Sequence, residues 1–221
     1  KYTLTEDNEI KIEYYGVPEE DTIVNLTNHS YFNLNGHASG AILDHEVWID
    51  ADNYLKTDGE SIPTGEILSV EHTPMDFRMK KAIGKDIDED YEATILGKGY
   101  DHNWCLNQND LNKKVAELSS KDSGITMEVY TDLPGIQLYT GNYIENDLGK
   151  DGVVYQQRQG VCFETQYYPD AIHHEEFKSP VFNKENPYKF GMGKSLLKTK
   201  LYPKIKQNVL YVILMILIRM S

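Results

Sequence analysis

The chain has 221 residues and a net charge of −13, with 22 Lys and Arg residues against 35 Asp and Glu residues. This length is enough for one sizeable hydrophobic core. The negative field excludes nucleic acids and anionic membrane surfaces as natural partners and favours a neutral small molecule. The two cysteines, Cys105 and Cys162, lack metal-type spacing. Isolated thiols are typical of a reducing compartment, so a cytoplasmic protein is predicted.

Short alternating segments separated by turn residues begin the chain. Residues 9–16 and 45–50 alternate apolar and polar side chains, as half-buried strands do. Residues 22–34 are also strand-like, with Asn, Thr, His and Ser among the apolar positions. Residues 51–66 carry Asp, Asn, Gly and Pro signals and are predicted to form a loop.

The second half of the chain continues this pattern. Residues 74–100 are irregular and charged, with room for a short helix near 79–83. A hairpin is predicted over 114–132 and a further strand over 136–143. Because strands dominate and helical periodicity is nearly absent, the predicted fold class is all-β, an antiparallel sandwich or barrel.

Residues 191–221 differ in composition from the rest. They contain six basic residues and no acidic residue, and they end in an apolar run from Val209 to Ile218. A helix of that length would cross only about half of the hydrocarbon core, so a transmembrane span is not expected. We expect one domain over residues 1–190 and a tail over 191–221 outside it. Copies of the chain could associate through an exposed sheet edge or through the apolar run.

One carboxylate stands out in the stretch from Gly160 to Ala171. Alternation places Glu164 in mid-strand, on the face opposite Val161 and Phe163. A carboxylate held among bulky neighbours is either a paired structural ion or a general base. Alternation alone leaves both interpretations open.

Other polar residues also stand among apolar or aromatic neighbours. Histidine titrates near neutrality, so His29 can act as an acid or a base, or be a satisfied core residue; His102 is equally eligible by composition. Asp101 can hold a sugar hydroxyl, keep a nearby His protonated or cap a turn. Gln137 and Tyr139 share one face of their strand. Carboxylates, amides, a His and aromatic faces are typical of a site for a neutral polyhydroxylated ligand.

Neither a metal nor a cofactor is predicted. His173 and His174 precede two glutamates, but adjacent histidines on an extended chain point in opposite directions. The His-x-x-x-His spacing that puts two ligands on one helix face is missing. The glycines form no nucleotide-binding motif.

Four segments, taken together and in order, resemble motifs of the aldose 1-epimerases, or galactose mutarotases. They are Thr-Asn-His-Ser-Tyr-Phe-Asn-Leu at 27–34, Tyr-Asp-His-Asn at 100–103, Leu-Pro-Gly-Ile-Gln-Leu-Tyr-Thr-Gly-Asn at 133–142 and Phe-Glu-Thr-Gln-Tyr-Tyr-Pro-Asp-Ala at 163–171. The resemblance covers residues 1–190 and corresponds to the C-terminal two-thirds of a family member. The sandwich is therefore expected to be incomplete at its N-terminus, where the family supplies an Arg and a second His.

The resemblance implies a large antiparallel β-sandwich that binds sugar in an open cleft on one sheet, without metal or cofactor. It implies that Glu164 is the catalytic base and His29 the catalytic acid, which we expect on opposite sides of the sugar. The substrate-binding residues that it implies are Asp101, Gln137, Ser30 and Tyr31.

The implied activity is that of an isomerase, an aldose 1-epimerase that interconverts the α and β anomers of a free hexose such as galactose or glucose. One alternative is a carbohydrate-binding sandwich with little turnover, because part of the family's site is not matched. Another is a hexose-6-phosphate 1-epimerase, which would need Arg or Lys near the phosphate. The sugar motifs contain neither.

Overall fold

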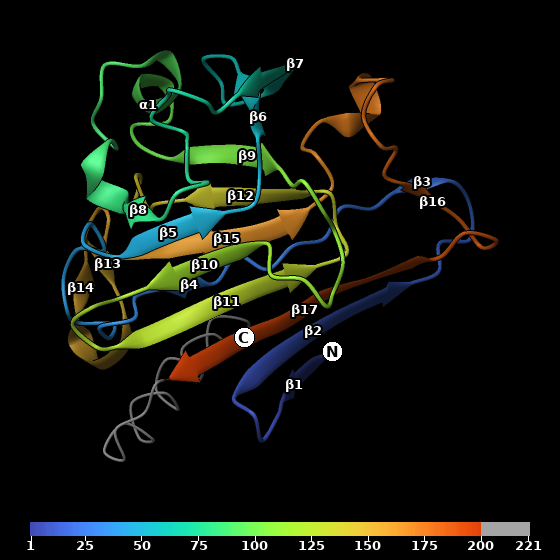
Figure 1. Cartoon of the computed structure of the whole chain (residues 1–221). Helices are drawn as coiled ribbons and strands as arrows, with labels where there is room; N and C mark the ends of the chain where they lie inside the picture. The colour runs from blue at the N-terminus through green and yellow to red at the C-terminus, as the bar shows by residue number, and fades with distance from the viewer. Residues whose placement is uncertain (200–221) are drawn as a thin grey trace.

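Antiparallel strands form nearly all of the regular structure in the computed structural model, which describes residues 1–199 (Figure 1). The apolar run from Val209 to Ile218 lies outside these residues. Helical structure in the described part is limited to one short α-helix and three 3₁₀ turns, namely α1 (Glu92–Leu96), η1 (Ile83–Lys85), η2 (Lys150–Gly152) and η3 (Ala171–His173). None of the helices described is long and apolar enough to cross a membrane. The all-β prediction is confirmed.

Two large sheets carry the fold. The seven-stranded sheet has the order β1 (Tyr2–Leu4), β2 (Glu9–Gly16), β17 (Tyr188–Thr199), β11 (Ile125–Thr131), β10 (Ala116–Ser119), β5 (Glu46–Ile49) and β8 (Lys81–Ala82). The six-stranded sheet has the order β4 (Tyr31–Phe32), β15 (Val161–Gln166), β12 (Gly135–Tyr139), β9 (Asp101–Cys105), β6 (Asn53–Thr57) and β7 (Pro63–Ser69). Two small pairs add β13 (Asp147–Leu148) with β14 (Val154–Tyr155), and β16 (Val181–Phe182) with β3 (Thr22–Ile23).

One hydrophobic core joins the two large sheets. Val47 and Leu118 enter it from the seven-stranded sheet, and Trp104, Leu138 and Phe163 enter it from the six-stranded sheet. Alternation along each strand then points the remaining side chains of the six-stranded sheet away from the core. The polar residues of β9, β12 and β15 therefore gather on that outer face.

The predicted loop over 51–66 is wrong, because this segment contains β6 and the start of β7. Asp58 makes the turn between them: its Oδ1 accepts hydrogen bonds from the backbone N–H groups of Glu60 at 2.8 Å and Ile62 at 3.0 Å. The Asp58-Gly59 pair is a hairpin signal that the abundance of turn residues obscured.

Two further expectations need correction. The helix near 79–83 is instead β8, which pairs with β5 and leads into η1, and the α-helix lies at α1. The strand over 22–34 is interrupted, with only β3 and β4 paired. Between them the side chain of Asn25 takes the place of a strand partner. Its Oδ1 accepts from the N–H of Tyr167 at 2.9 Å, and its Nδ2 donates to the Tyr167 carbonyl at 3.1 Å.

The predicted boundary between residues 190 and 191 falls inside β17. This strand pairs with β2 on one side and β11 on the other. The backbone of the seven-stranded sheet thus continues past residue 190 to Thr199.

Candidate active site

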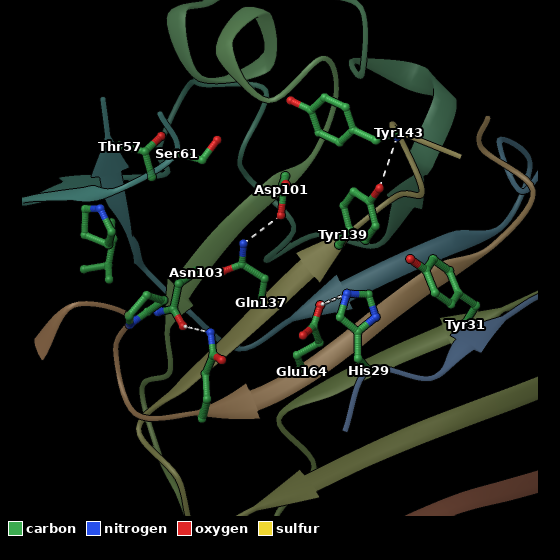
Figure 2. A pocket seen from close by; sticks show the side chains of 14 residues that line it. His29, Tyr31, Thr57, Ser61, Asp101, Asn103, Gln137, Tyr139, Tyr143 and Glu164 are labelled. Atoms are coloured by element: carbon green, nitrogen blue, oxygen red, sulfur yellow. Dashed lines mark hydrogen bonds and ion pairs between the residues drawn. The ribbon is translucent and has the colours of Figure 1, made fainter. Parts of the chain in front are cut away.

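Strand register builds the first row of the site on the outer face of the six-stranded sheet. Glu164 on β15 lies opposite Gln137 on β12, and Gln137 lies opposite Asn103 on β9. All three line one cavity of about 450 Å³ (Figure 2). Side chains directly opposite each other are close enough to interact, so the sheet pairing itself brings a carboxylate and two amides together.

A second row lies two residues further along. Tyr139 on β12 is opposite Asp101 on β9 and Cys162 on β15, and Cys162 is opposite Tyr31 on β4. Gln137 connects the two rows by donating from Nε2 to Asp101 Oδ1 at 2.8 Å. The two rows place two carboxylates on one face, together with amides, phenols and the thiol of Cys162.

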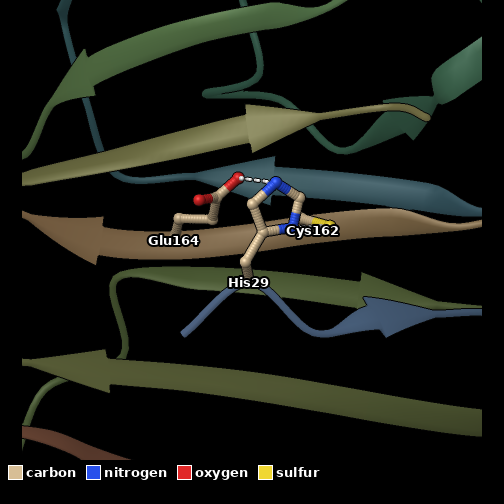
Figure 3. A group of neighbouring side chains, drawn as sticks. All are labelled: His29, Cys162 and Glu164. Carbon is tan, nitrogen blue, oxygen red and sulfur yellow. Dashed lines mark hydrogen bonds and ion pairs between the residues drawn. The ribbon is translucent and has the colours of Figure 1, made fainter. Parts of the chain in front are cut away.

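His29 approaches the rows from the irregular segment before β4. Its Nε2 lies 3.6 Å from Glu164 Oε1, and its Nδ1 lies 3.3 Å from Cys162 Sγ (Figure 3). The imidazole is half exposed, with 51% of its side-chain surface accessible, whereas Glu164 retains 10%. The ring is thus held between a buried acid and a buried thiol while one side faces the cavity.

Burial raises the pKa of Glu164 to about 7, and the negative charge of Asp101 adds to this shift. The pKa of Asp101 is also raised by burial, while the hydrogen bond from Gln137 and the charge of His29 act in the opposite direction. A carboxylate that titrates near neutrality can both accept and return a proton at physiological pH. Glu164 therefore has the properties of a general base.

The thiol of Cys162 is fully buried. Its pKa is raised well above the ordinary value, first by burial and then by the charges of Glu164 and Asp101. At neutral pH it is a neutral S–H beside His29. The thiol therefore contacts the imidazole without adding charge to the cavity.

Aromatic rings border the cavity next to His29. The ring centroids of Tyr31 and Tyr139 lie 5.1 and 5.8 Å from that of His29. Tyr143 stacks on Tyr139 at 6.5 Å, and its backbone N–H donates to the Tyr139 hydroxyl at 3.1 Å. Flat aromatic faces beside polar groups suit a ligand with C–H surfaces and many hydroxyls.

The other histidines considered from the sequence lie elsewhere. His102 points into the interior, 1% exposed, and burial lowers its pKa to about 4. It is a neutral core residue. His173 and His174 flank the end of η3 and both contact Asp170. Neither lines the cavity.

A family profile described as aldose 1-epimerase matches residues 1–193. The chain belongs to this family. Human galactose mutarotase is 44% identical over 177 residues, which is 80% of this chain and 50% of the relative. The aldose 1-epimerase of Haemophilus influenzae is 39% identical over 180 residues, or 80% of this chain and 52% of the relative. The chain thus spans about half the length of the curated relatives it matches.

Solved structures of the aldose 1-epimerase family share the fold. A GalM/aldose epimerase homologue from C. elegans superposes with a TM-score of 0.76 at 25% identity, covering 89% of this chain and 59% of the other. A galactose 1-epimerase from Lactobacillus acidophilus NCFM gives 0.73 at 30% identity, covering 86% and 53%. The mutarotase-like β-sandwich predicted from the sequence is confirmed.

The structure brings five of the six residues that the family resemblance implied into one cavity, namely His29, Tyr31, Asp101, Gln137 and Glu164. Ser30 is half-buried and is not one of the lining residues. His29 Nε2 and Glu164 Oε1 lie side by side, 3.6 Å apart. The expectation that these two groups act from opposite sides of a sugar stays a prediction.

Some lining residues were missed from the sequence. Asn103 and Gln166 stand in the quoted motifs and hydrogen-bond each other at 3.5 Å, and the register shared with Gln137 would have identified Asn103. Thr57 and Ser61 line the far side from the β6–β7 hairpin. They could have been found only by reading Asp58-Gly59 as a turn between strands.

Proposed function

We propose that this protein is an aldose 1-epimerase that interconverts the α and β anomers of a free hexose such as galactose or glucose. The observation that carries the proposal is the pair formed by His29 and Glu164 in an open polar cavity, 3.6 Å apart, with a carboxylate whose pKa is about 7. Relatives named galactose mutarotase and aldose 1-epimerase contain the matching sequence.

The reaction needs one base and one acid beside the anomeric carbon. Glu164 takes the proton from the C1 hydroxyl, while protonated His29 gives a proton to the ring oxygen and the C1–O5 bond breaks. The open aldehyde rotates about C1–C2 by roughly half a turn. His29 then takes the proton from the C5 hydroxyl, its oxygen adds to the other face of C1, and Glu164 returns its proton to O1. Each group ends in its starting state.

The side-by-side arrangement suits this chemistry. The ring oxygen and the C1 hydroxyl are bonded to the same carbon, so the groups that serve them must also be neighbours. With a pKa of about 7, Glu164 is basic enough to take the C1 proton and acidic enough to return it. The close contact with Glu164 also keeps His29 within reach of the position where the ring oxygen binds.

The remaining polar groups are placed to hold the sugar. Asp101 and Gln137 are already joined at 2.8 Å, and Gln137 Oε1 is buried without a hydrogen-bond partner in the described structure. A buried acceptor of this kind costs free energy until a donor reaches it. A sugar hydroxyl supplies that donor, while Tyr31 and Tyr139 contact the apolar face of the ring.

The cavity favours a free sugar over a phosphorylated one. Its lining within the described residues contains two carboxylates and neither lysine nor arginine. A phosphate placed there would face like charge with no guanidinium or ammonium partner. No observation favours the hexose-6-phosphate alternative. A cytoplasmic location and association of copies stay predictions.

The activity is tested by following freshly dissolved α-D-galactose and α-D-glucose, by polarimetry or with a β-specific dehydrogenase. The proposal expects anomerisation above the buffer rate, in proportion to the concentration of this chain. Sugar binding without acceleration would instead support a carbohydrate-binding module. The absence of both binding and acceleration would refute the proposal.

Asp101→Asn is expected to move the acid limb of the pH profile of kcat/KM to lower pH. Ionised Glu164 is the active form, so the rate rises with pH through its pKa of about 7. Because the charge of Asp101 raises that pKa, its removal lowers the midpoint, while burial still holds it above the ordinary value of 4.5. An unchanged midpoint would show that Asp101 does not act on Glu164. Asp76→Asn, outside the cavity, is the control.

A further inference from the structure

We infer that His29, Cys162 and Glu164 form a binding site for a zinc-type divalent cation, and that this cation inhibits the enzyme. One nitrogen, the sulfur and one carboxylate oxygen of these residues lie within 4.8 Å of one another. Metal binding depends only on this geometry, whereas the inhibitory effect rests on the proposed function.

The donor set is one that Zn²⁺ prefers. Imidazole nitrogen, thiolate sulfur and carboxylate oxygen bind Zn²⁺ at about 2.0–2.3 Å, so the donors of a tetrahedral site lie about 3.3–3.8 Å apart. Sγ lies 3.3 Å from Nδ1, and Oε1 lies 3.6 Å from the other ring nitrogen, Nε2. An ion uses only one of these nitrogens, and that nitrogen, the sulfur and the oxygen lie within 4.8 Å of one another, so a small shift of the ring is needed to close the site. Three protein donors leave the fourth position for water from the open cavity. Figure 3 shows the three side chains converging from β15 and from the segment before β4.

The ligand that must adjust is the most exposed of the three. Cys162 and Glu164 are fixed by β15, with no more than 7% of either residue exposed. His29 precedes β4 in an irregular segment and keeps half of its side chain accessible. Because His29 Nδ1 lies against the buried sulfur, the inference requires this ring to rotate so that the ion can reach Sγ and one ring nitrogen.

The charge around the site also favours a cation. The carboxylates of Glu164 and Asp101 both line the cavity beside this site. Among the described residues that line the cavity, the only basic side chain is His29. On binding, the S–H bond of Cys162 breaks, its proton passes to the buffer and a Zn–S bond forms. The positive ion offsets the repulsion between the thiolate and the neighbouring carboxylates.

The bound ion would stop turnover directly. It would occupy the lone pair with which Glu164 accepts the C1 proton and the imidazole nitrogen with which His29 protonates the ring oxygen. Neither could then transfer a proton. Because sugar and ion use the same groups, each should weaken the binding of the other.

The test is titration of the metal-free chain with Zn²⁺ and with Co²⁺, using Mg²⁺ as an oxygen-preferring control. We expect one Zn²⁺ site that Cys162→Ser and His29→Ala each weaken by at least about 10-fold, since the loss of even an outer-shell partner costs roughly that much. Co²⁺ should give a thiolate charge-transfer band that disappears in Cys162→Ser. Cys105→Ser, the other buried free thiol, is the matched control and should retain both.

Inhibition is measured as the anomerisation rate with Zn²⁺ relative to the metal-free rate of the same variant. We expect galactose to raise the apparent Kd for Zn²⁺. Zn²⁺ binding that is unchanged in both Cys162→Ser and His29→Ala, but lost in His174→Ala, would assign the metal to the His173–His174 pair at η3 and overturn the inference. Binding with no measurable anomerase activity would keep the metal site and refute the proposed function. Anomerisation without Zn²⁺ binding that depends on Cys162 would support the proposed function and refute the metal site.

Discussion

Glu164→Gln is expected to lower the rate of anomerisation by roughly 10²–10⁴-fold, the usual contribution of a general base. The amide has nearly the same shape as the acid and can still hydrogen-bond, but it cannot take the C1 proton. Sugar binding should therefore survive while turnover is lost. Coupled-dehydrogenase kinetics measure the first quantity, and calorimetric titration with galactose measures the second.

Glu9→Gln is the matched control for this substitution. Glu9 is also a buried glutamate in a strand, 8% exposed against 7% for Glu164, but it is the first residue of β2 and pairs with Lys11 at 3.4 Å. Its variant should retain full activity. Turnover by Glu164→Gln within a few-fold of the parent chain would remove Glu164 from the role of base.

The second large effect is expected at His29. His29→Ala removes the acid that protonates the ring oxygen, and the rate should fall by roughly 10²–10⁴-fold. Because half of this side chain faces the open cavity, imidazole from the buffer can enter the space it leaves. Partial recovery of the rate with rising imidazole concentration is the expected signature of a lost proton donor.

If His29 had only a structural role, the His29→Ala variant would give a different result. The variant would then lose folded protein, visible in its circular dichroism, and imidazole would restore nothing. His72→Ala, at an exposed position outside the cavity, controls for nonspecific acceleration by the added base. An imidazole-dependent increase in rate of equal size in that variant would contradict the assignment.

Local patterns predicted the facing of individual strands well. Alternation placed Glu164 opposite Phe163, and the structure puts Phe163 in the core and Glu164 in the cavity. The same reasoning placed Gln137 and Tyr139 together, as observed. These predictions succeed because side-chain facing in a strand depends on a period of two and on nothing distant.

What could not be predicted depends on register between strands far apart in the chain. Cys162 reads as an ordinary buried thiol in its own strand. Its place beside His29 arises from the pairing of β15 with β4, across more than a hundred residues of sequence. The adjacency of His29 and Glu164 has the same origin. Motif resemblance pointed to the residues, but their distances belong to the assembled sheet.

The position of β17 has a consequence for how the molecule folds. This strand, last among the described elements, lies between β2 and β11 and joins the two parts of the seven-stranded sheet. Among the described strands, β1 and β2 pair only with each other until β17 is synthesised, and a lone hairpin is marginally stable in water. Closing this sheet requires contacts between the first and last thirds of the chain, which is typical of slow folding. Strands β1 and β2 are therefore synthesised well before β17, the strand that ties them to β11.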